Sequence, residues 1–122
     1  MPKKILLVED EEIIFSLLQK KLTEQGYEVF VAKDGEEGLK EIREQKPDLV
    51  LLDIVMPVKT GFEVMEEMQD DDNLKDIPVI VISNSGEPVE LDRAKDLGAR
   101  DWLIKTEFDP KEVIEKVKKQ IG

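Results

Sequence analysis

The sequence predicts an α/β fold, a doubly wound five-stranded parallel sheet of the (βα)5 type. Apolar runs alternate five times with segments whose apolar residues recur at helical spacing, and the connections are short. This alternation is typical of parallel sheets with helices on both faces. Three of the runs are continuously apolar, as expected for strands covered on both sides. A length of 122 residues fits one domain with one core.

The first half of the chain predicts two strand–helix units. A strand at residues 3–8 is followed by a helix that ends at Gly26. A second strand is expected at 27–32. The next helix opens with Asp34 as N-cap and Glu37 three residues later, the spacing of a capping box. The apolar face of the first helix comprises Ile13, Ile14, Leu17, Leu18 and Leu22, and that of the second comprises Leu39 and Ile42.

The second half predicts three further units. The third strand, at 48–52, contains four consecutive apolar residues. Thr60 and Glu63 form another capping-box pattern, which opens a helix. A fourth strand at 78–82 leads to a helix with Pro88 in its first turn. The remaining elements are a fifth strand at 101–104 and a last helix that starts near Asp109.

The composition narrows the possible functions. A net charge of −11 argues against direct binding of nucleic acid or of an anionic membrane surface, since both would repel the chain. The absence of Cys and His excludes disulfides, thiolate nucleophiles, Ser-His-Asp catalysis and most transition-metal sites. Because no apolar run approaches membrane-spanning length and no signal-peptide pattern is present, a cytoplasmic location is expected.

Polar side chains follow the apolar runs where the strands end. Glu9 and Asp10 follow the first strand, Asp53 the third, Ser83 the fourth and Lys105 the fifth. Parallel strands bring these ends to one edge, where open α/β sheets bind ligands. Each residue alone has an ordinary explanation as a cap, a turn residue or a solvated charge. Their convergence at one edge favours a functional site.

Three carboxylates at this edge predict a bound cation. Two carboxylates about 4 Å apart repel by roughly 4 kcal/mol at an effective dielectric near 20, so Glu9, Asp10 and Asp53 need compensation. Mg²⁺, before Ca²⁺, fits one or two carboxylates plus water and readily takes phosphate oxygens. A carboxylate nucleophile, a divalent cation, a Lys and a hydroxyl are the parts of an aspartyl-phosphate site.

Several short motifs occur in order on the expected strands. They are Val8-Glu9-Asp10, Asp53 with Met56-Pro57 and Gly61, Val81-Ile82-Ser83, and residues 98–105. With these motifs the chain resembles the receiver domains of two-component response regulators, close in size to the stand-alone type. The resemblance implies one receiver domain over residues 1–122, a flavodoxin-like sheet with strand order 2-1-3-4-5, and a signalling domain rather than an enzyme.

The resemblance also implies a role for each residue at the strand ends. Asp53 would accept a phosphoryl group from a phosphohistidine on a sensor histidine kinase or phosphotransfer protein. Ser83 would bind a phosphoryl oxygen, and Lys105 would form its ion pair. The implied Mg²⁺ ligands are Asp10, Asp53 and the backbone carbonyl of Val55, with Glu9 acting through water.

Trp102 occupies the position of the family's switching Tyr or Phe; its alternative interpretation is a surface-packed aromatic residue. Phosphorylation would draw Ser83 inward and alter the face made by the fourth helix, fifth strand and fifth helix, which would bind a downstream protein. The chain itself would be a monomer or weak dimer.

Thr106 replaces the family's Pro after Lys105, which predicts a trans bond between Lys105 and Thr106 and a rearranged loop before the last helix. Asn84 follows Ser83 where the family tends to have Ala or Gly. Its larger side chain is expected to narrow access to Asp53, so small donors should phosphorylate the chain more slowly than its Asn84→Ala variant.

Other functions fit the residues less well. A phosphatase of the haloacid-dehalogenase kind needs a general acid two residues after its Asp nucleophile, where this chain has Val55. A flavodoxin-like electron carrier needs a phosphate-binding loop after the first strand, but the acidic residues 9–12 would repel a phosphate. A receiver-fold binding module, or a phosphorelay intermediate with weak or no switching, stays an alternative.

Overall fold

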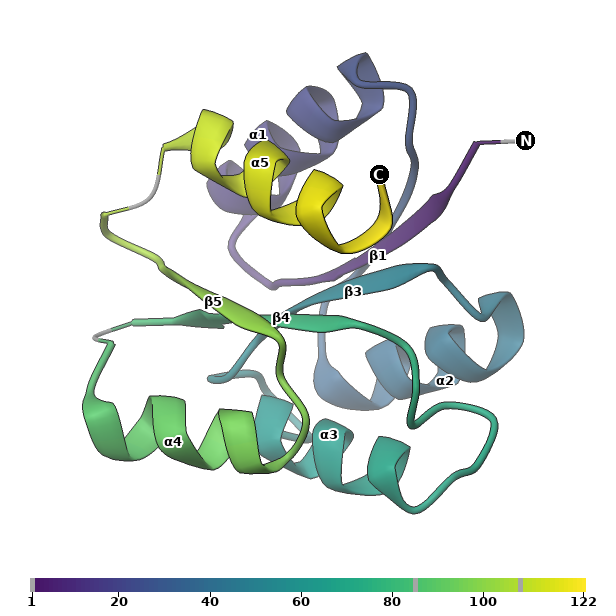
Figure 1. Ribbon diagram of the computed structural model, residues 1–122, viewed down its shortest axis with the longest axis vertical. Helices are drawn as coiled ribbons and strands as arrows, with labels where there is room; N and C mark the ends of the chain where they lie inside the picture. The colour runs from purple at the N-terminus through teal and green to yellow at the C-terminus, as the bar shows by residue number, and fades with distance from the viewer. Residues whose placement is uncertain (1, 85, 108) are drawn as a thin grey trace.

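The computed structural model describes residues 2–84, 86–107 and 109–122 and confirms the predicted fold. Five parallel strands form one sheet in the order β2-β1-β3-β4-β5. Strands and helices alternate along the whole described chain (Figure 1). The elements are β1 (Lys4–Val8), α1 (Glu12–Glu24), β2 (Glu28–Ala32), α2 (Gly35–Gln45), β3 (Leu49–Asp53), α3 (Gly61–Gln69), β4 (Val79–Ser83), α4 (Pro88–Asp96), β5 (Asp101–Ile104) and α5 (Pro110–Ile121).

Helices cover both faces of the sheet. In Figure 1, α1 and α5 lie on one side of the strands, and α2, α3 and α4 lie on the other. Successive strand residues point to opposite faces, so Leu51 packs with the α1 and α5 side chains while Leu52 packs with those of α2 to α4. Two apolar cores therefore sandwich the sheet.

The two strands that carry candidate site residues are buried along their full length. Every residue of β3 and β4 is buried, including the polar residues that end them, Asp53 and Ser83. Both are paired within the sheet, Asp53 opposite Ile82 and Ser83 opposite Ile104. The sequence predicted that these strands end one residue earlier, at 52 and 82, because a polar residue after an apolar run usually marks the end of a buried strand. Here the ladder continues one residue into the polar edge.

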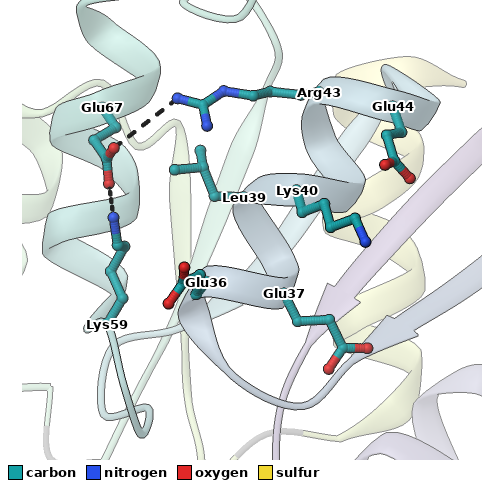
Figure 2. A pocket seen from close by; sticks show the side chains of 8 residues that line it. All are labelled: Glu36, Glu37, Leu39, Lys40, Arg43, Glu44, Lys59 and Glu67. Carbon is teal, nitrogen blue, oxygen red and sulfur yellow. Dashed lines mark hydrogen bonds and ion pairs between the residues drawn. The ribbon is translucent and has the colours of Figure 1, made fainter.

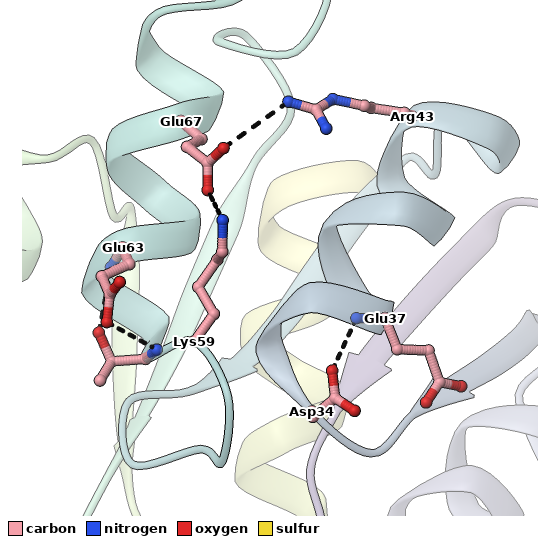
Figure 3. Close-up of polar contacts among 7 residues, drawn as sticks. Asp34, Glu37, Arg43, Lys59, Glu63 and Glu67 are labelled. Atoms are coloured by element: carbon pink, nitrogen blue, oxygen red, sulfur yellow. Dashed lines mark hydrogen bonds and ion pairs between the residues drawn. The ribbon is translucent and has the colours of Figure 1, made fainter.

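The predicted helix caps are largely confirmed. Thr60 and Glu63 form a complete capping box at α3 (Figure 3). Asp34 caps α2 by accepting the backbone N–H of Glu37 at 2.7 Å. The reciprocal bond differs, because the Glu37 carboxylate accepts the N–H of Lys33 instead of that of Asp34.

One part of the predicted α1 face is wrong. Leu18 and Leu22 are buried, but Ile13 is 86% exposed and Leu17 is 38% exposed. At about 100° per residue, Ile13 lies roughly 140° around the helix from Leu18, outside the stripe that faces the sheet.

Each helix in the described ranges is too short or too polar to cross a bilayer.

Candidate metal centre

Three acidic side chains converge where β1 and β3 end. One carboxylate oxygen from each of Glu9, Asp10 and Asp53 lies within 4.8 Å of the others. Glu9 and Asp53 are fully buried, whereas Asp10 is exposed. The predicted convergence is thus present, with the exposed member on the solvent side of two buried carboxylates.

Lys105, at the end of β5, supplies a positive charge to this cluster. Its Nζ lies 2.8 Å from Oδ2 of Asp53, 2.9 Å from Oε1 of Glu9 and 2.8 Å from Oε1 of Glu11. The side chain is only 8% exposed. Burial alone would lower the pKa of Lys105, but the hydrogen bonds to these three carboxylates outweigh it and the pKa is raised. Lys105 therefore stays charged at neutral pH.

The carboxyl group of Glu9 has a raised pKa. Burial is the main cause that raises its pKa from 4.5 to about 7, and the charge of Asp53 adds to the effect, against the hydrogen bond from Lys105. Its Oε1 accepts hydrogen bonds from Lys105 and from the backbone N–H of Glu11. Its Oε2 is buried and has no hydrogen-bond partner among the residues that the structure describes. A buried oxygen in this state calls for a proton, a water or a cation.

The donor set fits a hard divalent cation. Glu9, Asp10, Glu11 and Asp53 carry four negative charges when ionised, against one positive charge on Lys105, which leaves an excess of three. All the converging donors are oxygens, the ligands that Mg²⁺ and Ca²⁺ prefer. The excess charge and the Glu9 oxygen that has no partner among the described residues together favour a bound cation at this edge.

The loop after β3 returns to the site because of two glycines. The N–H of Gly61 donates to the carbonyl of Ile54 at 2.8 Å, and a Cβ on Gly61 would lie 2.5 Å from the Asp53 carbonyl oxygen. A Cβ on Gly35, at the start of α2, would lie 1.9 Å from the carbonyl oxygen of Lys59. These close approaches explain why glycine is needed at both positions; Gly61 packs against the backbone of Asp53 and Gly35 against the loop that follows β3.

Ser83 ends β4 beside this cluster, but its hydroxyl is engaged elsewhere. It donates to Oε1 of Glu90 in α4 at 2.7 Å and accepts the N–H of Gly86 at 3.1 Å. The Ser83 carbonyl accepts the N–H of Lys105 at 2.7 Å, which joins the ends of β4 and β5. Glu90 could not be predicted from the sequence, because nothing in its spacing distinguishes it from the other acidic residues of a largely exposed helix.

Glu11 was also missed as a site residue. It belongs to the acidic run 9–12, of which only Glu9 and Asp10 were predicted to be site residues. Its backbone N–H bonds to Glu9 and its carboxylate turns back to Lys105. The sequence gives no signal for this contact, because a carboxylate in an acidic loop is ordinarily solvated and the Glu11 side chain is itself 58% exposed.

The remaining predicted residues lie in the segments that follow β3, β4 and β5, and on β5 itself. The N–H of Val55 donates to Oδ1 of Asp53 at 3.2 Å, while the metal role of its carbonyl stays a prediction. The described residues contain no cis peptide bond, which confirms the trans link between Lys105 and Thr106. Asn84 is exposed, and Trp102 is 41% exposed on β5.

A hollow of about 710 Å³ lies apart from these residues, between α2 and α3 (Figure 2). None of the acidic groups at the strand ends lines it. Glu67 of α3 pairs with Lys59 on its own side of the hollow and with Arg43 of α2 across it (Figure 3). Both cations therefore share one carboxylate. Because none of the strand-end side chains lines the hollow, the strand-end cluster is the better candidate site.

The fold and the site define a doubly wound α/β domain with a carboxylate-rich centre at its strand ends. The family model described as "Response regulator receiver domain" matches residues 5–118. The chain therefore belongs to the receiver domain family of two-component signalling, whose members are signalling modules rather than conventional enzymes.

Three relatives show the range of similarity. The chain is 40% identical over 118 residues to the alkaline phosphatase synthesis transcriptional regulatory protein PhoP of Bacillus subtilis, covering 97% of this chain and 48% of that protein. It is 34% identical to the polar-differentiation response regulator DivK of Brucella anthropi, covering 100% and 98%. The receiver domain of sensor histidine kinase PA1611 of Pseudomonas aeruginosa, solved with a magnesium ion coordinated in its active site cleft, has 25% identity and a TM-score of 0.90, covering 100% and 99%.

The chain spans about half the length of many of the curated relatives that it matches, as the comparison with PhoP shows. The similarity therefore concerns the receiver part of such proteins.

Proposed function

We propose that this chain is a phosphoacceptor domain of a two-component pathway, acting in the cytoplasm. Asp53 takes a phosphoryl group from a phosphohistidine on a sensor histidine kinase or phosphotransfer protein. The observation that carries this proposal is the buried Asp53 carboxylate, 2.8 Å from Lys105 and within the cluster formed with Glu9 and Asp10. These are the groups that a transfer to an aspartate requires.

In the proposed step, an oxygen of Asp53 attacks phosphorus. The N–P bond of the phosphohistidine breaks, an O–P bond forms, and the imidazole leaves with the electron pair and takes a proton from solvent. Lys105 stabilises negative charge on the transferring group, because its ammonium already lies against Asp53. Ser83 donates a hydrogen bond from its hydroxyl to a phosphoryl oxygen once the group has arrived.

A metal ion completes the proposed site. Asp10, Asp53 and the carbonyl of Val55 would hold Mg²⁺, with Glu9 acting through water. When bound, the ion supplies positive charge to the phosphoryl oxygens. The excess of negative charge in the cluster supports this assignment, as does the magnesium ion in the similar receiver domain of PA1611.

The output would be protein binding. The face made by α4, β5 and α5, which carries Trp102, would change on phosphorylation and bind a downstream protein. A net charge of −11 disfavours direct contact of this domain with nucleic acid.

Intact mass after incubation with acetyl phosphate and Mg²⁺ tests the phosphoacceptor role. The proposal predicts the gain of one phosphoryl group, which EDTA prevents and Asp53→Asn abolishes. Asp48→Asn is the matched control, because Asp48 lies at the opposite end of β3 and should leave the mass gain intact. An unmodified wild-type protein would support the binding-module alternative, and a gain that persists in Asp53→Asn would place the chemistry elsewhere.

A further inference from the structure

The hydroxyl of Ser83 can serve only one hydrogen-bond acceptor at a time. A serine hydroxyl has a single proton to donate, and here that proton goes to the Glu90 carboxylate at 2.7 Å. The residue is fully buried, so solvent offers no competing acceptor. A bond from a hydroxyl to a carboxylate is among the stronger hydrogen bonds in proteins.

The same bond joins α4 to the sheet. Ala94 is the one buried residue among the nine of α4, so apolar burial holds this helix only lightly. The N-cap residue, Glu87, makes no side-chain capping bond. Farther along the helix, Arg93 contacts α3 through Glu66 at 3.1 Å. Among the residues that the structure describes, the bond between Ser83 and Glu90 is the side-chain hydrogen bond that ties the first turn of α4 to the end of β4.

We infer that Glu90 is a positioning residue that acts as a latch on Ser83. In the resting arrangement the latch withholds the hydroxyl proton from Asp53. A phosphoryl group on Asp53 competes with Glu90 for that proton, and its success releases the first turn of α4. Glu90 thus sets how readily the domain reaches its phosphorylated arrangement. This inference rests on the proposed function, because it gives Ser83 its role toward a phosphoryl oxygen.

The test measures affinity for beryllium fluoride, a phosphoryl mimic, in the presence of Mg²⁺. The amide signal of Gly86 is a suitable NMR readout, since its N–H donates to the Ser83 hydroxyl oxygen. Glu90→Ala should tighten mimic binding about tenfold, the equivalent of one lost hydrogen bond to a charged acceptor. Glu90→Gln keeps an acceptor without the charge and should give a smaller gain.

Two controls separate the latch from a general effect on the helix. Glu87→Ala removes the same charge from the same helix end without touching Ser83, and should leave the affinity unchanged. In a Ser83→Ala background, Glu90→Ala should have no further effect, because the donor is already absent.

Mimic binding that Glu90→Ala leaves unchanged, or a gain that persists in the Ser83→Ala background, would overturn the latch alone. A wild-type protein that takes up no mimic would overturn the proposed function and the latch with it. The two failures are therefore distinguishable.

Discussion

Glu9 should make the protein less stable as the pH rises toward neutrality. Its pKa in the folded state, about 7, lies above the ordinary value of 4.5. The folded protein therefore holds the proton more tightly than the unfolded chain does. The resulting stabilisation is fully present below about pH 4.5 and is lost as the pH rises through 7.

The size of the effect follows from the shift. One pKa unit corresponds to about 1.4 kcal/mol. Over the range from pH 5 to pH 8, most of the shift is expressed, so Glu9 should contribute a loss of about 2.5 kcal/mol. A small domain has a free energy of unfolding of about 5–15 kcal/mol, so this loss is readily measured.

Urea unfolding at pH 5, 6, 7 and 8 without divalent cations, for wild type and Glu9→Gln, isolates this contribution. The Gln variant does not titrate at position 9, so the difference between the two proteins should change by about 2.5 kcal/mol across the series. A constant difference from altered packing cancels, because the change with pH is compared. Parallel pH profiles for the two proteins would refute the assignment of the raised pKa to Glu9.

Three further changes test the site and the loop that carries it. Val58 is 73% exposed and has a φ of 68°, a left-handed conformation that costs an L-residue about 1–2 kcal/mol. Val58→Gly should therefore raise the free energy of unfolding by about 0.5–1 kcal/mol in urea titrations. A lower free energy of unfolding would contradict backbone strain at this position. Gly61→Ala would place a Cβ 2.5 Å from the Asp53 carbonyl oxygen and should lower stability by about 1–3 kcal/mol in the same assay, whereas wild-type stability would show that the loop yields freely. Asn84→Ala should speed phosphorylation by acetyl phosphate severalfold, measured by intact mass over time, and equal rates would show that Asn84 does not restrict access.

The sequence carries enough information for the strands and for the convergence at their ends. Continuous apolar runs mark buried parallel strands, and the carboxyl ends of parallel strands lie at one edge of the sheet. The sequence alone therefore predicts that Asp53 and Lys105 lie at the same edge. Strand order came from the family resemblance. Both inferences depend on backbone arrangement, which apolar burial determines strongly.

The partners of individual polar side chains could not be predicted in the same way. Glu11 turns back to Lys105, and Glu90 takes the hydroxyl of Ser83, because of rotamers and distances that arise only when distant segments pack. The exposure of Ile13 has a related origin, since apolar spacing alone did not define the edge of the buried stripe on α1. Local sequence pattern describes which residues share an element, and tertiary packing decides what each side chain contacts.

A calorimetric Mg²⁺ titration at pH 8 tests the acidic centre most directly. Wild type should bind one ion, Asp10→Asn and Asp53→Asn should each weaken binding at least tenfold, and Asp48→Asn should leave it unchanged. Absence of Mg²⁺ binding by wild type, or equal binding by all four proteins, would contradict a metal centre built from these carboxylates.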